Sequence, residues 1–244
     1  MANRGTRKAN AQRRAKSGTS KKWVADSRDR EWFDDPAIIY DRLAARRVYY
    51  QTAVVGIPDE IQRIGRTLDR SNVLEIGPGH FPFSATLDSL KVTFLDISKG
   101  ILQRNQEELR RLHEDPRFRN ATTANVGFVH ADARKGLPQE LAGQHFSALV
   151  MNEVLTHVHP KERKAFLEEW ARHTDSFMIV DRHPTTTAKA KKRPDFVSGH
   201  EIKDELERLG FRVTHFDIKL VQLKGKKTPG GRDWYFILTA KKQH

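Results

Sequence analysis

From residue 71 onward, short apolar runs alternate with longer segments in which apolar residues recur at helical spacing. The runs predict strands and the longer segments predict helices, a pattern typical of an α/β fold with a mostly parallel sheet covered on both faces. The last two predicted strands are joined by a turn rich in Gly and Lys, which indicates an antiparallel hairpin at one edge. The predicted strands are 73–76, 91–96, 127–130, 146–151, 177–180, 211–221 and 234–240. The predicted helices include 161–172, 201–209 and one that carries Ile101, Leu102, Leu109 and Leu112.

Two segments precede this α/β pattern. Residues 1–22 lack apolar periodicity and contain eight Lys and Arg but no acid, which predicts a disordered basic arm. Such an arm suits the phosphates of RNA, or it is simply a solubilising terminus. Residues 23–70 predict a helical extension with starts at Asp35-Pro36 and Pro58. It either covers a sheet edge or serves as a lid over the domain at 71–244.

Composition excludes several classes of protein. The 244 residues carry a net charge of +13 and no cysteine, which rules out disulfides, thiolate metal sites and a Cys nucleophile. No apolar run approaches the roughly 20 residues that span a bilayer, so we expect no membrane partner and a cytoplasmic protein. Two basic clusters fall in predicted loops and favour a polyanionic partner such as RNA, with ordinary solvated loops as the alternative. They are Lys189, Lys191, Lys192 and Arg193, and Lys224, Lys226, Lys227 and Arg232.

A glycine turn after the first predicted strand is the strongest sign of a ligand site. Gly77 and Gly79 would let the backbone approach a ligand where a Cβ would clash, although a plain tight turn has the same pattern. Asp96 follows 19 residues after Gly77, the distance at which an acid binds the ribose hydroxyls of a nucleoside. The alternative for Asp96 is a helix cap. Asp132 ends the third strand, where it either meets an adenine amino group or serves as a turn residue.

With these residues the chain resembles the class I S-adenosylmethionine (SAM)-dependent methyltransferases over residues 71–241. Glu75–Gly79 is similar to the first motif of that family, and 151–158 to its fourth-strand motif. The resemblance implies a Rossmann-like seven-stranded sheet with a reversed terminal hairpin, SAM over the strand ends, and S-adenosylhomocysteine (SAH) as product. Phe81 replaces the third glycine of the family turn. The implied cofactor-binding residues are Glu75, Gly77, Pro78, Gly79, Asp96, Ile97, Asp132, Ala133 and Asn152.

Methyl transfer from a sulfonium is an in-line displacement, so the protein must mainly align the reacting groups. The fourth-strand motif offers Asn152, Glu153 and His157 as candidate catalytic residues; His157 could act as a base, or be a loop histidine. His157 and His159 are too few for a metal site, so we expect no metal. Near the ends of the fifth strand and its loop, the candidate substrate-binding residues are Arg182, His183, Lys191, Lys192 and Arg193.

The absence of certain motifs narrows the range of possible methyl acceptors. No Asn-Pro-Pro-Tyr-like run follows the fourth strand, and the covalent route to 5-methylcytosine needs a cysteine. The charge distribution favours an RNA methyltransferase. A small-molecule O- or N-methyltransferase with an N-terminal lid is the first alternative. A non-catalytic RNA-binding protein of this fold, suggested by Phe81, is the second.

Overall fold

The computed structural model describes residues 63–79, 83–87, 89, 91–114, 125–184, 196–222 and 232–243. The predictions made for the basic arm at 1–22, for most of the helical extension and for Phe81 lie outside these residues. So do those for Lys191, Lys192 and Arg193. Within the described part, residues 63–65 are helical, and Ile64 and Leu68 are buried in an apolar cluster that includes Val73 and Val92.

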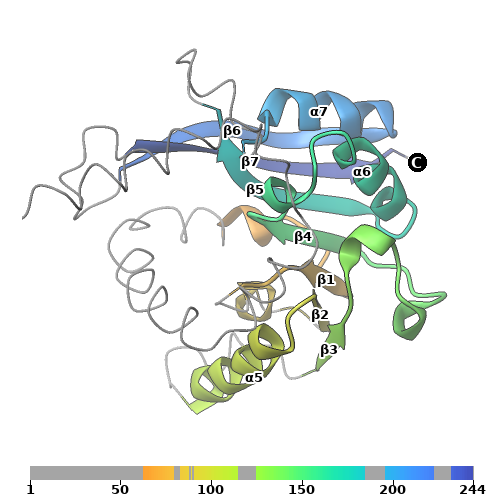
Figure 1. The fold of residues 1–244 in the computed structure, drawn as a ribbon, viewed down its shortest axis with the longest axis vertical. Coiled ribbons are helices and arrows are strands. Elements are labelled where there is room, and N and C mark those ends of the chain that lie inside the picture. The colour runs from red at the N-terminus through yellow and green to blue at the C-terminus, as the bar shows by residue number, and fades with distance from the viewer. Residues whose placement is uncertain are drawn as a thin grey trace, which may run out of the picture.

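A seven-stranded sheet in the order β3-β2-β1-β4-β5-β7-β6 forms the centre of the molecule (Figure 1). β1 to β5 run parallel, and β7 lies antiparallel between β5 and β6. The predicted α/β class, the seven strands and the reversed terminal hairpin are therefore confirmed. The strands are β1 (Val73–Ile76), β2 (Val92–Asp96), β3 (Val126–His130), β4 (Ala148–Asn152), β5 (Ser176–His183), β6 (Phe211–Gln222) and β7 (Arg232–Lys242).

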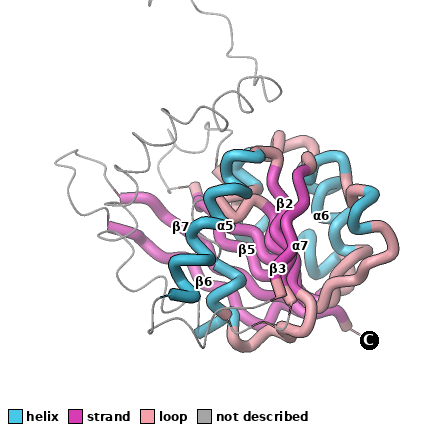
Figure 2. The backbone as a smooth tube through the Cα atoms, turned by 90° about the horizontal axis from the view of Figure 1, so that it is seen from below, coloured by secondary structure: helices cyan, strands magenta, loops and turns pink. Residues whose placement is uncertain are grey.

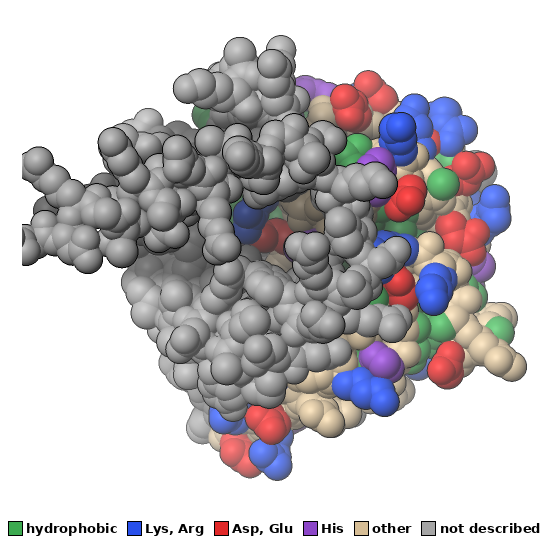
Figure 3. All heavy atoms as spheres, in the orientation of Figure 1, with side chains coloured by type: hydrophobic (Ala, Val, Ile, Leu, Met, Phe, Trp, Pro, Cys, Tyr) green, Lys and Arg blue, Asp and Glu red, His purple; other side chains and the backbone are tan. Residues whose placement is uncertain are grey.

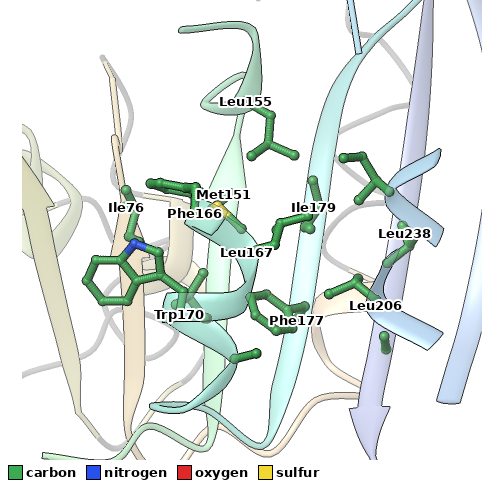
Figure 4. Close-up of a cluster of buried hydrophobic side chains, with 14 of the residues drawn as sticks. Ile76, Met151, Leu155, Phe166, Leu167, Trp170, Phe177, Ile179, Leu206 and Leu238 are labelled. Carbon is green, nitrogen blue, oxygen red and sulfur yellow. The ribbon is translucent and has the colours of Figure 1, made fainter. Parts of the chain in front are cut away.

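The central strands read as continuous apolar runs because helices cover both faces of a parallel sheet. α6 (Arg163–Ala171) and α7 (Gly199–Arg208) pack on one face, where Trp170 and Leu167 lie against Ile76 and Ile179 (Figure 4). α5 (Lys99–Glu114) contributes Leu102 and Leu109 to a second apolar cluster. The tube view in Figure 2 shows α5 and α6 on either side of the strands.

Short 3-10 turns follow β1, β3 and β4 in the chain. They are η1 (Phe83–Thr86), η2 (Ala133–Lys135), η3 (Gln139–Leu141) and η4 (Leu155–His157). No helix in the described ranges is long and apolar enough to cross a membrane.

Candidate active site

The candidate site residues gather at the carboxyl edge of the sheet, where open α/β sheets bind ligands. β1, β2, β4 and β5 are parallel neighbours, so their carboxyl ends meet at this edge. β7 runs the other way, and its beginning joins the same edge because Tyr235 pairs with Arg182 and Trp234 with His183. Residues from five strands can therefore contribute to one site.

The glycine turn after β1 has the geometry that a close ligand requires. Gly77 and Gly79 both have φ of 61°, in the left-handed region where a Cβ is strained. A Cβ on Gly77 would lie 3.0 Å from Cγ2 of Val154, so the turns after β1 and β4 are in contact, whereas one on Gly79 would meet nothing within 4 Å. The Asn105 side chain on α5 donates to the Gly79 carbonyl at 3.1 Å. The turn is thus held from two sides and leaves open space at Gly79, as a bound cofactor would need.

Glu75 supports the turn from beneath the surface. It is fully buried, and its Oε2 accepts a hydrogen bond from the Ser84 backbone N–H at 2.7 Å, which ties η1 to β1. Oε1 has no hydrogen-bond partner among the described residues. Burial raises the pKa of this carboxyl to about 7, against the lowering effect of its bonds to Ser84 and Phe83. Pro78, between the two glycines, is also buried.

Asp96 ends β2 nearly buried, and its Oδ1 accepts from the Ser98 N–H at 2.8 Å. Ser98, rather than Asp96, caps α5 through a bond from the Ile101 N–H at 3.1 Å. Asp96 therefore shapes the turn that leads into the helix, so that its carboxylate stands at the carboxyl edge. The neighbouring Ile97 carbonyl lies 2.9 Å from Nε2 of His130, which joins the ends of β2 and β3.

Asp132, predicted to face an adenine amino group, is engaged by Arg134. The guanidinium donates to Oδ1 at 2.9 Å and to Oδ2 at 2.8 Å, and the Arg134 N–H donates to Oδ1 at 3.1 Å. Partial burial would raise the pKa of Asp132, but the bonds and charge of Arg134 lower it overall. These bonds are those of a turn residue, which was the alternative interpretation of Asp132. The adjacent Ala133 carbonyl accepts from the Trp170 indole at 3.2 Å.

Two buried polar side chains hold the loop after β4. Asp181 on β5 is fully buried, and its oxygens accept from the Thr156 N–H at 3.3 Å and the Arg182 N–H at 2.8 Å. Arg163 on α6 donates its Nε to the carbonyls of Leu155 at 3.0 Å and Val158 at 3.1 Å. Its Nη1 reaches the Phe196 carbonyl at 3.0 Å. Asp181 therefore holds an N–H group of this loop, and Arg163 holds two of its carbonyls.

Glu153, at the start of this loop, lies at the centre of a polar network. Its Oε2 accepts from Arg182 at 2.9 Å and its Oε1 from the Tyr235 hydroxyl at 3.0 Å. Asn152, the last residue of β4, is half-buried beside it. The structure therefore brings together the predicted Asn152, Glu153 and Arg182, and it adds Tyr235, Asp181 and Arg163.

The histidines take different places. His157 ends η4 and is exposed. His183 is half-buried, and its Nδ1 accepts from the Gly199 N–H at 3.1 Å, so the proton of the neutral ring is on Nε2. Burial and the neighbouring His200 lower the pKa of His183. Within the described ranges no group of His, Cys, Asp and Glu side chains could hold a metal ion.

A pH prediction follows from Asp181, whose pKa burial raises to about 7, with the Glu153 charge adding to the rise. Between about pH 4 and 7 the folded state retains a proton that the unfolded state releases, so the free energy of unfolding falls by up to about 1.4 kcal/mol per pH unit per group. We expect Asp181→Asn to lose less stability than the wild type between pH 5 and 8 in urea unfolding. An identical loss in both proteins would contradict the buried carboxyl.

The fold and this edge define a class of protein. A parallel sheet with a reversed β7, a glycine turn after β1 and an acid after β2 is the arrangement of the class I SAM-dependent methyltransferases. Residues 73–177 match the family model described as a methyltransferase domain. This stretch of the chain is similar to a methyltransferase domain, and solved structures with the same fold contain bound SAH or SAM.

Solved structures show the same fold at low sequence identity. Magnesium protoporphyrin IX methyltransferase from Synechocystis, with bound SAH, has a TM-score of 0.64 at 17% identity, covering 88% of this chain and 97% of that one. A proposed RNA methyltransferase from Pyrococcus horikoshii has a TM-score of 0.51 at 12% identity, covering 77% and 85%. TehB from Haemophilus influenzae has a TM-score of 0.55 at 13% identity, covering 84% of this chain and 67% of that one. Comparison with curated protein sequences gives no match.

Proposed function

We propose that this enzyme transfers the methyl group of SAM to RNA. The observation that carries the proposal is the division of charge along the chain. The described residues hold 22 Lys and Arg against 20 Asp and Glu, a net charge of +2. The remaining +11 of the total +13 lies in the other segments. The described part of the chain is thus almost neutral, and the excess positive charge lies in the remaining segments, which suits binding along a phosphate backbone.

The attachment points of the two basic loops support the same proposal. The segment with Lys189–Arg193 leaves the sheet after His183, at the carboxyl end of β5. The segment with Lys224–Lys227 joins β6 to β7, and Trp234 near the start of β7 pairs with both His183 and Leu220. Both segments therefore start from the edge that carries Glu153 and Arg182. In Figure 3, Lys, Arg, Asp and Glu side chains are mixed over the visible described surface, as the near-neutral count implies.

For the reaction, SAM supplies an activated methyl group when it is bound. We assign its binding to the glycine turn at Gly77–Gly79, with Pro78 and Glu75 shaping that turn and Asp96 accepting the ribose hydroxyls. Ile97, Asp132, Ala133 and Asn152 complete the proposed cofactor set. Glu153 and Asn152 orient the methyl acceptor, His157 is the candidate base, and Arg182 and His183 face the substrate. The loops and backbone that hold these groups supply alignment, which accounts for much of the acceleration in such a displacement.

A matched pair of variants tests the RNA proposal. Lys191→Ala with Lys192→Ala removes two charges from a basic loop, and Arg110→Ala with Arg111→Ala removes two exposed charges from α5. We expect only the loop variant to bind total RNA more weakly, by roughly 3- to 10-fold at low salt, with a shallower dependence of affinity on salt concentration. Equal affinity of the two variants, or an affinity that does not change with salt, would contradict the proposal.

A small-molecule acceptor is the second candidate. The SAM-bound structure of magnesium protoporphyrin IX methyltransferase covers 92% of this chain and 100% of that one, at a TM-score of 0.63 and 17% identity. The likeness thus extends along almost the whole chain of an enzyme that is named for a small-molecule substrate. If this candidate is correct, removal of residues 1–22 leaves methyl transfer unchanged and the label enters a small-molecule fraction.

A further inference from the structure

The carboxylate of Glu153 is held more rigidly than a surface glutamate. Each of its two oxygens accepts from a different donor: Oε2 from the Arg182 guanidinium at 2.9 Å and Oε1 from the Tyr235 hydroxyl at 3.0 Å. The Glu153 side chain is 15% exposed and that of Arg182 is 30% exposed, so the pair is partly shielded from water. Two donors from two strands fix both the position and the plane of this carboxylate.

The backbone of Glu153 is strained. Its φ of 55° makes it the one non-glycine residue with a positive φ in the described part of the chain. A residue held in this region costs of the order of 1–3 kcal/mol, and such strain clusters at active sites. The surrounding bonds enforce it: the Glu153 N–H donates to the Val180 carbonyl at 2.7 Å, and the Thr156 hydroxyl donates to the Glu153 carbonyl at 3.0 Å.

Glu153 also lies close to the glycine turn at Gly77–Gly79. Val154, the next residue, has its Cγ2 3.0 Å from the position of a Cβ on Gly77. Tyr235 belongs to β7 and is directly opposite Arg182 of β5, so their side chains leave the same face of the sheet. Only 7% of Tyr235 is exposed. Its hydroxyl is therefore directed at Glu153 by the register of β7 against β5.

We propose that Tyr235 is a positioning residue for the methyl acceptor. Together with Arg182 it holds the Glu153 carboxylate as a fixed acceptor for an N–H or O–H group next to the methyl group that is transferred. A carboxylate oxygen can accept more than one hydrogen bond, so each oxygen of Glu153 retains the capacity for a substrate donor. This inference rests on the proposed methyl transfer and adds to it a residue that acts through Glu153 rather than on the substrate.

The test compares two variants that each remove one hydroxyl from β7. Tyr235→Phe removes the bond to Glu153. Thr239→Val removes a buried hydroxyl whose Oγ1 lies 2.9 Å from that of Thr214, on a part of β7 that pairs with Met178, away from the carboxyl edge. Labelled methyl transfer from SAM is measured with total RNA, and in parallel with a small-molecule extract. SAH affinity is measured by calorimetry and the unfolding midpoint by thermal melting.

We expect Tyr235→Phe to lower kcat about 10-fold in whichever fraction the wild type labels, because a misplaced reacting partner loses rate steeply. SAH affinity should change less than 2-fold, and Thr239→Val should keep kcat within 2-fold at an equal or larger loss of melting temperature. Adding Tyr235→Phe to Glu153→Gln should cause little further loss, because the two residues act as one unit.

Three results would overturn the inference. The first is a wild-type kcat in Tyr235→Phe, and the second is equal loss of kcat in Thr239→Val. The third is a double variant whose loss of kcat equals the product of the losses in Tyr235→Phe and Glu153→Gln. Label in the small-molecule fraction with the expected kcat losses would overturn the RNA proposal but support the role of Tyr235. Absence of label from both fractions would overturn both.

Discussion

Replacing Arg163 with methionine should lower the free energy of unfolding by about 3–5 kcal/mol, because it removes the hydrogen-bond donor of three backbone carbonyls. The Arg163 side chain is buried and donates to the carbonyls of Leu155, Val158 and Phe196. Methionine keeps the apolar stem but leaves these carbonyls without their donors, and each buried acceptor without a partner costs about 1–3 kcal/mol. The loops after β4 and before α7 would separate, and methyl transfer should fall with stability.

Arg172→Met is the matched control, because Arg172 lies at the end of the same helix with a 65% exposed side chain. Its ion pair with Glu169 is a surface pair, for which a loss of about 0–1 kcal/mol is expected. Urea unfolding of both variants decides the question. A loss below about 1 kcal/mol for Arg163→Met would contradict its role in joining the two loops.

The second large effect is on cofactor affinity. Gly79→Ala should weaken SAM binding at least about 10-fold, because its Cβ enters open space where the backbone meets the cofactor. The control is Gly143→Ala. Gly143 also has a positive φ, 74°, and a Cβ there also meets nothing within 4 Å, but it precedes β4 at the opposite edge of the sheet. Both variants incur the same kind of backbone strain, of the order of 1 kcal/mol.

Calorimetric titration of Gly79→Ala and Gly143→Ala with SAM separates the effect of backbone strain from that of a lost contact with the cofactor. The expected result is a similar loss of stability in both variants with an affinity loss in Gly79→Ala alone. Equal affinities of Gly79→Ala and Gly143→Ala would mean that the cofactor does not approach the turn at Gly79.

The order and type of the strands were predictable from sequence because buried parallel strands are short apolar runs bounded by turns. The end of β5 was not predictable in this way. Asp181, Arg182 and His183 are polar, so the predicted strand ends at residue 180, whereas pairing with β7 extends it to His183. Antiparallel pairing with β7, which follows only after α7 and β6, is a long-range interaction that periodicity within the segment does not reveal.

In the candidate site, too, local sequence features were predictable and long-range contacts were not. Gly77, Gly79 and Asp96 could be predicted as site residues because a glycine turn and an acid at a fixed spacing are local signals. Tyr235 was missed because it is 82 residues from Glu153 and reads as an ordinary strand aromatic. For Asp132 the nearby Arg134 determines the geometry, and no spacing rule indicates that a guanidinium two residues away bonds both carboxylate oxygens.

Labelled methyl transfer from SAM into total RNA, ribosomal subunits and a small-molecule extract, run side by side, tests the central claim most directly. Gly79→Ala serves as the low-affinity control and Gly143→Ala as its match. We expect label that RNase removes, produced by the wild type and Gly143→Ala and much reduced in Gly79→Ala at low SAM concentration. Label confined to the small-molecule fraction would contradict the RNA substrate, and equal label from both glycine variants would contradict the cofactor site.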